Sequence, residues 1–392
     1  MLTARENLWV TLVSISLLFI TGMASGQDEK VEELVFKPGQ LLRLDINEGG
    51  SVLAEGWDKS VIRIAWYDNS GDVEDHNISI EEDQDGCEVV AEWVKGRHRQ
   101  TSSLHFRVKV PRMCDIEFRS NGGGLELINL EGRFSGRTAG GSISIKRCKG
   151  EAHLTSGGGE IEVIDCEMDG KITTGGGPVL VENVIGDLKA TSGGGNVQYR
   201  NVRDRTGHSR GPGGGSADDY DPETILILTA GGEINVDEAP EGADVTTGGG
   251  DIHIENAAKF VHAKTGGGDI EIELEGGSVT AGTGAGDIDV TITGEGDGKG
   301  KGVRLASGYG DIRLVVPKGF SMDLDLRIAF TRNSSQDFQF VTELDIETEG
   351  SRDWDTSEGS PKKYLYGTGD IRGGKIPVEI RTTNGNIYIT EK

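Results

Sequence analysis

Residues 247–272 read TGGGDIHIENAAKFVHAKTGGGDIEI, and the two ends of this stretch are nearly the same segment repeated after 18 residues. In each copy a threonine is followed by three glycines, an aspartate and then isoleucines at alternate positions. Alternation of apolar and polar residues is the period of a half-buried β-strand, and glycine clusters mark tight turns. The stretch therefore predicts short strands joined by glycine turns.

The same pattern recurs eleven times along the chain. Its first aliphatic residue falls at Leu125, Ile143, Ile161, Val179, Val197, Ile234, Ile252, Ile270, Ile288, Ile312 and Ile387. A serine or threonine always stands five positions before that residue and a glycine two positions before it, as Thr247 and Gly250 do. Units this short cannot fold alone, so neighbouring units must stack. We predict an all-β chain, a parallel β-helix or β-solenoid with 18-residue coils and β-rich caps at both ends.

Composition divides the chain into four parts. Residues 1–26 contain Arg5, an apolar run at 8–20 and a small-residue exit, which is typical of a signal peptide. We therefore expect an exported protein that is periplasmic, on the cell surface or extracellular, with no transmembrane segment in the mature chain. Residues 27–118 predict an N-terminal β cap with antiparallel strands at 61–66, 87–94 and 104–110. Residues 119–315 predict the β-solenoid, with an insertion at 200–222, and residues 316–392 a C-terminal β region that completes it.

The chain is strongly acidic, with 65 Asp and Glu residues against 40 Lys and Arg residues and a net charge of −25. Such a surface repels the phosphates of nucleic acid and of anionic lipids. We therefore expect no nucleic-acid partner. The expected partner is a protein or a glycan at the cell envelope.

Short segments outside the repeat carry a family resemblance. FKPGQL at residues 36–41, EGGSV at 48–52 and EGW at 55–57 resemble the opening of the bacterial “putative adhesin” family of unknown function. VPR at 110–112 and RTTNGNI at 381–387 resemble later parts of the same family. The resemblance implies an extracytoplasmic β-solenoid, and it brings no catalytic residues.

One column of acidic residues suggests a metal site. The residue before the first aliphatic is Asp251, Asp269 and Asp287 in three consecutive coils. Stacked coils would place these like charges about 4.8 Å apart. A Ca²⁺ ion would relieve their repulsion, since it binds carboxylate oxygens. We favour solvated aspartates that cap the turns, with a calcium column as the alternative and no other cofactor.

Two further patterns resemble sites of known chemistry. His253, Glu271 and Asp289 fall in one outward column and are residue types that bind Zn²⁺, although strand columns commonly mix polar residues. GHSRG at residues 207–211 matches the nucleophile-elbow pattern, which has meaning only on a strand-to-helix turn. No helix is predicted there, so we interpret it as a loop coincidence.

Four cysteines in an exported chain suggest disulfides. Cys148 and Cys166 are 18 residues apart and should stack, either as a disulfide or as a pair of buried thiols. Cys87 and Cys114 lie in the expected N-terminal cap and could form a second pair.

These patterns favour an exported, non-enzymatic β-solenoid that serves as an adhesin-like surface or envelope module for binding or structure. The insertion at residues 200–222 is the first segment expected to contact a partner. One alternative is a polysaccharide-acting β-helix enzyme, which would work through carboxylates and basic residues along one face. Another is a periplasmic partner in envelope stress or regulation.

Overall fold

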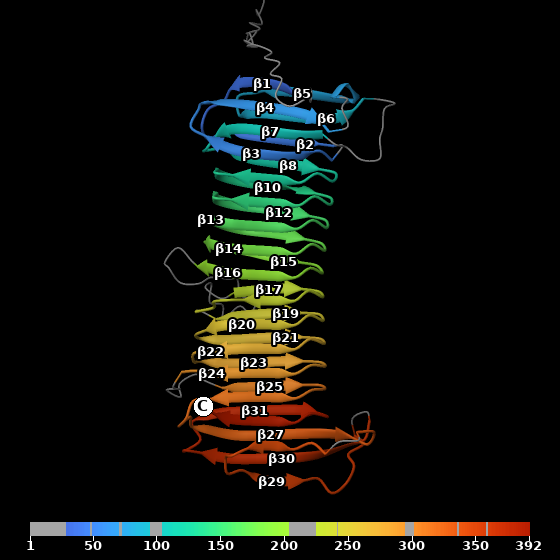
Figure 1. Ribbon diagram of the computed structural model, residues 1–392, viewed down its shortest axis with the longest axis vertical. Helices are drawn as coiled ribbons and strands as arrows, with labels where there is room; N and C mark the ends of the chain where they lie inside the picture. Colours follow the sequence, from blue (N-terminus) through green and yellow to red (C-terminus); the bar gives the residue numbers. More distant parts are fainter. Residues whose placement is uncertain are drawn as a thin grey trace, which may run out of the picture.

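The computed structural model describes residues 29–47, 49–69, 73–94, 104–203, 225–240, 242–294, 302–334, 337–357 and 360–392. These residues form an elongated rod of strands stacked along the long axis (Figure 1). The described ranges contain no α-helix, only the 3₁₀ segment η1 (Val73–Asp75), and hence no helix long and apolar enough to cross a bilayer. The predicted all-β solenoid is confirmed.

Two sheets run the length of the rod. Sheet one contains, in spatial order, β1 (Lys30–Val35), β4 (Val61–Asp68), β7 (Leu104–Pro111), β3 (Ser51–Trp57), β9 (Leu125–Ile128), β11 (Ile143–Lys146), the first part of β13 (Ile161–Thr174), β14 (Val179–Ile185), β16 (Val197–Arg203), β18 (Ile234–Val236), β20 (Ile252–Ala257), β22 (Ile270–Leu274), β24 (Ile288–Ile292), β26 (Ile312–Val316), β32 (Ile387–Glu391) and β28 (Phe340–Thr342). Sheet two contains β5 (His76–Glu82), β6 (Gly86–Trp93), β2 (Leu41–Ile46), β8 (Asp115–Ser120), β10 (Glu131–Thr138), β12 (Lys149–Ser156), the second part of β13, β15 (Leu188–Ser192), β17 (Ile225–Thr229), β19 (Ala243–Thr247), β21 (Phe260–Thr265), β23 (Ser278–Thr283), β25 (Val303–Ser307), β31 (Ile376–Thr383), β27 (Met322–Thr331), β30 (Lys362–Ile371) and β29 (Glu347–Gly350).

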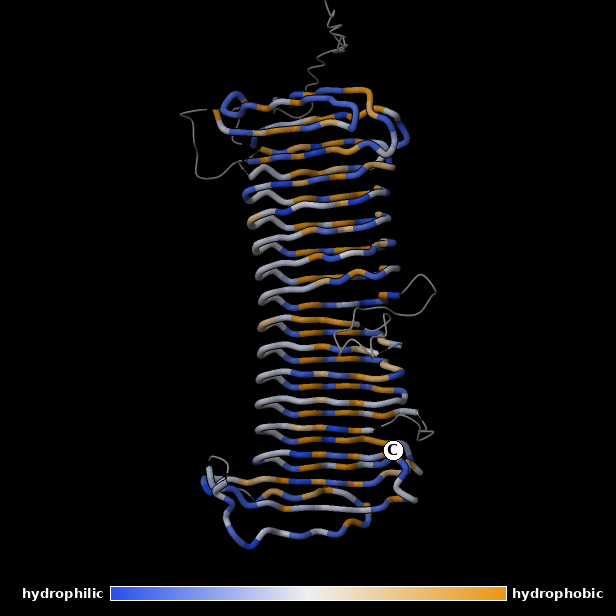
Figure 2. Tube along the Cα trace, turned by 180° about the vertical axis from the view of Figure 1, so that it is seen from behind, coloured by the Kyte–Doolittle hydropathy of each residue, from blue (hydrophilic) through white to orange (hydrophobic). Residues whose placement is uncertain are grey.

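The core lies between the two sheets and follows the 18-residue period. Ile143 pairs in parallel register with Leu125 on one side and with Ile161 on the other, and all three side chains are buried. Alternate residues point inward, so apolar and polar segments alternate along each strand in Figure 2. Each coil thereby gives its aliphatic residues to one continuous core.

A buried hydroxyl group connects successive coils. Thr247 donates from Oγ1 to the carbonyl of Gly232 in the preceding coil (2.8 Å) and accepts from the amide of Gly250 in its own turn (3.2 Å). Ten residues of this column donate to a glycine carbonyl of the preceding coil: Thr138, Ser156, Thr174, Ser192, Thr229, Thr247, Thr265, Thr283, Ser307 and Thr382. The column therefore satisfies backbone groups that water cannot reach.

The glycines of this turn allow the coils to approach each other. A Cβ atom added to Gly250 would lie 2.1 Å from the carbonyl oxygen of Gly232, whereas one added to Gly249 would meet nothing within 4 Å. The turns stack as a pale column along one edge of the rod (Figure 2). Only one glycine in each such pair is required by contact with the neighbouring coil.

A second turn closes each coil at the opposite edge. In six coils this turn contains a non-glycine residue with positive φ, for example Asn129 (φ 56°), Asn183 (φ 54°) and Asn201 (φ 49°). Asparagine tolerates this left-handed conformation better than most residues do. The Asn201 side chain also donates to Oδ1 of Asn183 at 2.8 Å. In these six coils the sequence signal for the turn is a polar residue four positions after the first aliphatic.

Both ends of the rod stack their coils out of sequence order. Strand β2 pairs in parallel with β6 and β8, and β3 pairs in parallel with β7 and β9. At the other end β31 lies between β25 and β27, and β32 between β26 and β28. The parallel stack thus extends into the expected N-terminal cap, where segments 87–94 and 104–110 also have parallel partners. Antiparallel pairing is confined to β1, β4 and β5 with their neighbours at this end and to β27, β29 and β30 at the other.

Isoleucines border the hydroxyl column at both ends. Ile46 is the register partner of Ser120, and Ile328 is the register partner of Thr382. Neither position carries the serine or threonine of the motif, so an apolar side chain replaces the buried hydroxyl.

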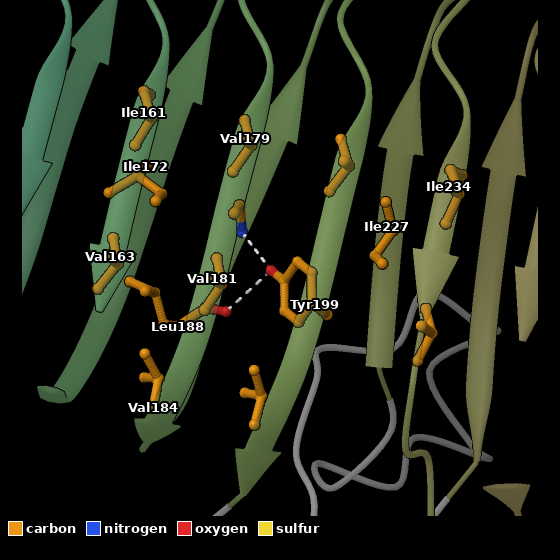
Figure 3. Close-up of a cluster of buried hydrophobic side chains, with 14 of the residues drawn as sticks. Ile161, Val163, Ile172, Val179, Val181, Val184, Leu188, Tyr199, Ile227 and Ile234 are labelled. Atoms are coloured by element: carbon orange, nitrogen blue, oxygen red, sulfur yellow. Dashed lines mark hydrogen bonds between the residues drawn. The ribbon is translucent and has the colours of Figure 1, made fainter. Parts of the chain in front are cut away.

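The ladder of sheet two is interrupted between β15 and β17. These strands share the single register pair Ser192–Thr229, whereas β17 and β19 share five pairs. Tyr199, fully buried on β16 of the opposite sheet, fills the gap: its hydroxyl accepts from the Ala190 amide (2.9 Å) and donates to the Leu188 carbonyl (3.4 Å), as Figure 3 shows. The predicted insertion at 200–222 starts later than expected, because residues 200–203 still belong to β16 and pair with β14, and residues 204–224 lie outside the described ranges.

The Gly249–Gly250 pair provides a matched test of coil spacing. We expect Gly250→Ala to lower the free energy of unfolding by at least about 2 kcal/mol, because the methyl group overlaps backbone that cannot move away. Gly249→Ala should leave it unchanged within about 1 kcal/mol. Urea midpoints of the two variants measure the difference, and equal midpoints would contradict the proposed close approach.

Tyr199→Phe tests the interrupted ladder. The change keeps the buried ring but leaves the Ala190 amide and the Leu188 carbonyl unpaired, so we expect a loss of about 1–3 kcal/mol in unfolding free energy. Tyr309→Phe is the control, because Tyr309 is 61% exposed. A Tyr199→Phe melting curve that overlays the wild-type curve would show that the hydroxyl is dispensable.

Candidate functional site

The predicted aspartate column has a structural role. Asp251, Asp269 and Asp287 stack as expected, and each accepts a backbone hydrogen bond from the next coil. The Asp269 amide donates to Oδ1 of Asp251, the Asp287 amide to Oδ1 of Asp269, and the Asp311 amide to Oδ1 of Asp287, each at 2.8 Å. The carboxylates therefore extend the hydrogen-bond ladder beyond the ends of the strands.

A protein cation sits at one end of this column. The Arg313 guanidinium lies 3.5 Å from a carboxylate oxygen of Asp287, 3.2 Å from one of Asp289 and 3.5 Å from one of Asp311. In the part of the chain that the structure describes, no group of three His, Cys, Asp or Glu side chains is arranged to hold a metal ion. The calcium column stays a prediction, and the geometry gives its carboxylates another role.

The histidine column is assembled as predicted, but its members pair with each other. His253, Glu271 and Asp289 are register neighbours in successive coils. His253 Nδ1 lies 3.1 Å from Glu271 and Nε2 lies 3.0 Å from Glu255. Burial lowers the pKa of His253, but the two glutamates outweigh burial and raise it above its ordinary value. Both ring nitrogens are thereby engaged with carboxylates.

The stacked cysteines are buried free thiols. Cys148 and Cys166 lie in adjacent coils, and the Cys148 amide donates to the Cys166 sulfur at 3.4 Å. In-register parallel neighbours keep their Cβ atoms near the strand spacing of about 4.8 Å, whereas a disulfide needs about 3.8 Å. Burial raises the pKa of Cys148 to about 12. In the structure Cys148 and Cys166 are therefore a pair of buried thiols and do not form a disulfide.

The structure does not place Cys87 and Cys114 for a bridge, because a strand lies between them. Cys87 is on β6 and pairs with Leu42, while Cys114 directly precedes β8, which pairs with the other edge of the same strand β2. Two strand spacings amount to about 10 Å, beyond the Cα separation of about 7 Å that a disulfide tolerates. Both residues are buried free thiols.

The N-terminal end contains a serine–histidine contact that no sequence pattern indicates. Ser51 Oγ lies 2.5 Å from His105 Nδ1, and the Asn69 amide nitrogen lies 2.7 Å from His105 Nε2. An amide donor at Nε2 leaves the ring proton on Nδ1, directed at Ser51, so the imidazole is not placed to accept the serine proton. Burial also lowers the pKa of His105. The 207–211 elbow pattern lies outside the described residues.

One charged strip lies on the outward face of each sheet, and the two strips differ in sign and in their position along the rod. The acidic strip on sheet one consists of Asp251, Glu255, Asp269, Glu271, Glu273, Asp287 and Asp289. The cationic strip on sheet two consists of Arg119, Arg137, Lys171 and Lys189, on β8, β10, β13 and β15. These four residues are separated along the chain by residues of both signs, so the sequence alone conceals the strip.

The outward face of sheet two is hollowed at one end of the cationic strip. An open hollow of about 620 Å³ is lined by Glu117, Arg119, Ser135, Gly136, Arg137 and Thr155. Two adjoining hollows of about 270 and 490 Å³ also have Glu117 in their walls. Glu117 lies 3.4 Å from Arg43 and 2.7 Å from Arg119, so its charge is shared between two guanidiniums. This face presents both a concave surface and exposed cations.

The aspartate column provides a test that separates capping from calcium binding. Asn196 accepts the Glu233 amide at 3.0 Å in an equivalent position, so an amide oxygen suffices as a cap. We expect Asp269→Asn to keep wild-type stability and Asp269→Ala to lose roughly 1 kcal/mol, because only alanine leaves the Asp287 amide without its acceptor. Thermal melts with and without EDTA complete the test. A calcium column would instead give a lower melting temperature in EDTA and in the asparagine variant.

Comparison with known proteins adds little to this description. No protein-family model matches the chain, and no curated protein sequence matches it. Among solved structures, the chain is similar to a “putative cell adhesion protein” from Clostridium sporogenes, at 11% identity and a TM-score of 0.18, over 93% of this chain and 100% of that one. It is also similar to a “Putative lipid binding protein” from Parabacteroides distasonis, at 10% identity and a TM-score of 0.31, over 68% of this chain and 95% of that one. At such low identities and TM-scores, neither likeness carries function over to this chain.

Proposed function

We propose that the protein is an exported, non-enzymatic, adhesin-like binding module that presents the outer faces of a rigid solenoid to partners at the cell envelope. The observation that carries this proposal is the difference between inward and outward positions of the repeat. Residues of the inward columns and of the turns form the core and its hydrogen bonds. Residues of the outward columns differ from coil to coil and include two strips of opposite charge. Segments such as FKPGQL at residues 36–41, which resemble the adhesin family, support the same function.

Three features of the described residues favour binding over catalysis. The hollows of sheet two are open and shallow, and a principal carboxylate in their walls, Glu117, is shared between Arg43 and Arg119. The Ser51–His105 contact has its ring proton directed at the serine. The four thiols are buried, and burial raises their pKa values, which keeps them protonated at neutral pH.

Co-sedimentation with isolated cell-envelope material tests the proposal. We expect the purified full chain to sediment with envelopes at 50 mM salt and to be released at 500 mM, because screening weakens contacts between exposed charges. Serum albumin, also acidic, should stay in the supernatant and serves as the control. The size distribution of the envelope glycans should be unchanged by the chain. A chain that stays in the supernatant at 50 mM salt, or that shortens the glycans, would overturn the proposed function.

A further inference from the structure

We propose that the cationic strip binds a linear acidic polysaccharide laid along the rod axis. This inference rests on the proposed binding function and names the chemistry of the ligand. It starts from the positions of Arg119, Arg137, Lys171 and Lys189, which the 18-residue period brings onto one face of sheet two.

The strip is built from two adjacent outward columns. Arg119 and Arg137 are register partners in one column, and Thr155 is the next member of that column. In the neighbouring column Lys171 and Lys189 are register partners. Successive coils are about 4.8 Å apart, so the strip from β8 to β15 spans about 20 Å along the rod. Figure 1 shows these strands as consecutive rungs.

Three of the four cations have no carboxylate within ion-pair distance among the described residues. Within the described ranges, Arg137, Lys171 and Lys189 form no ion pair, and Arg119 shares Glu117 with Arg43. Fixed cations in register repel one another, and a bound anion relieves that repulsion. An excess of exposed positive charge is unusual in a chain whose net charge is −25. The strip is therefore a local exception to the charge of the whole molecule.

Hydroxyl groups accompany the cations along the same face. Ser135 and Thr155 line the hollow at Arg119 and Arg137. Further along, Thr173 and Thr191 are register partners, with their hydroxyl oxygens 3.1 Å apart. Ammonium and guanidinium groups bind carboxylate or sulfate oxygens, and neighbouring hydroxyls can donate to or accept from sugar hydroxyls. This mixture matches a polymer that carries both anionic groups and hydroxyls.

The shape and charge of the molecule favour a single polysaccharide chain over other polyanions. Duplex DNA carries a charge about every 1.7 Å, and a bilayer extends its charge beyond the strip, so both would meet the acidic remainder of the surface. A thin chain can stay within the strip. The acidic strip lies on the opposite sheet and on later coils, more than the Debye length of about 8 Å away at physiological salt, so it is largely screened from such a ligand.

The experiment uses the full chain and polygalacturonate, a linear polyuronate, as the probe. We expect binding at 50 mM salt that weakens as salt is raised. The triple variant Arg137→Gln, Lys171→Gln, Lys189→Gln should raise Kd by roughly a hundredfold, since each surface cation contributes about a fivefold factor toward an anionic partner. The control triple Lys264→Gln, Lys318→Gln, Lys375→Gln removes the same charge elsewhere and should change Kd by no more than about threefold, because long-range screening leaves only local charge effective. Circular dichroism melts verify that both variants fold.

Several outcomes would overturn the assignment. Equal weakening by the two triple variants would show a general charge effect, and an unchanged Kd in the strip variant would place binding elsewhere. Tighter binding to a DNA duplex or to phosphatidylglycerol vesicles than to polygalacturonate would assign the strip to another class of anion. If envelopes still bind the wild-type chain while polygalacturonate does not, the ligand assignment fails and the proposed function stands. If neither binds, both fail.

Discussion

The structure depends on one buried hydrogen-bonding arrangement, in which a serine or threonine hydroxyl bridges a glycine amide in its own turn and a glycine carbonyl in the coil before. Thr247 illustrates it with Gly250 and Gly232. The hydroxyl can reach that carbonyl only if the turns stack closely, and the turns stack closely only if Gly250 has no side chain. The hydroxyl and the glycine are therefore needed together, because each can fulfil its role only when the other is present. Because the arrangement links equivalent positions of adjacent coils, it also holds the aliphatic columns in register, since a slip of one residue would turn the aliphatic side chains outward.

Much of the fold could be predicted from the sequence, because residues one period apart lie side by side in a solenoid. The stacking of Cys148 on Cys166, and of His253 on Glu271, follows from their separation of 18 residues. This reasoning does not apply where the chain departs from the 18-residue period. The strand order at the N-terminal end places β2 between β6 and β8, and this order separates Cys87 from Cys114. Nothing in the local sequence of either cysteine specifies that order, because it depends on which distant strand pairs with each edge of β2.

The candidate surface was only partly predictable, for a related reason. Acidic columns are visible in the sequence because one motif position repeats the same residue type, as at Asp251 and Asp269. The cationic strip draws on two columns and changes residue type from arginine to lysine along its length. Its members are separated along the chain by carboxylates, some of which, like Glu117, are paired with arginines. Net charge conceals such a strip, because it averages over faces that are far apart in the fold. Charge must therefore be summed by face and by coil, over distances comparable to the screening length.

The same geometry separates stability from binding. The core, the hydroxyl column and the glycine turns lie within the solenoid or along its edge, while the strip residues Arg137 and Lys171 extend from the outward face and contribute no hydrogen bond to the ladder among the described residues. Exposed substitutions of this kind usually change stability by less than about 0.5 kcal/mol, whereas removal of a buried hydrogen-bonding group costs several times more. Outward columns can therefore change from coil to coil without disturbing the rod. Since each repeat contacts only its neighbours, a change in one coil also leaves the rest of the surface in place. A solenoid of this kind can keep one fold while its outer faces acquire different ligands.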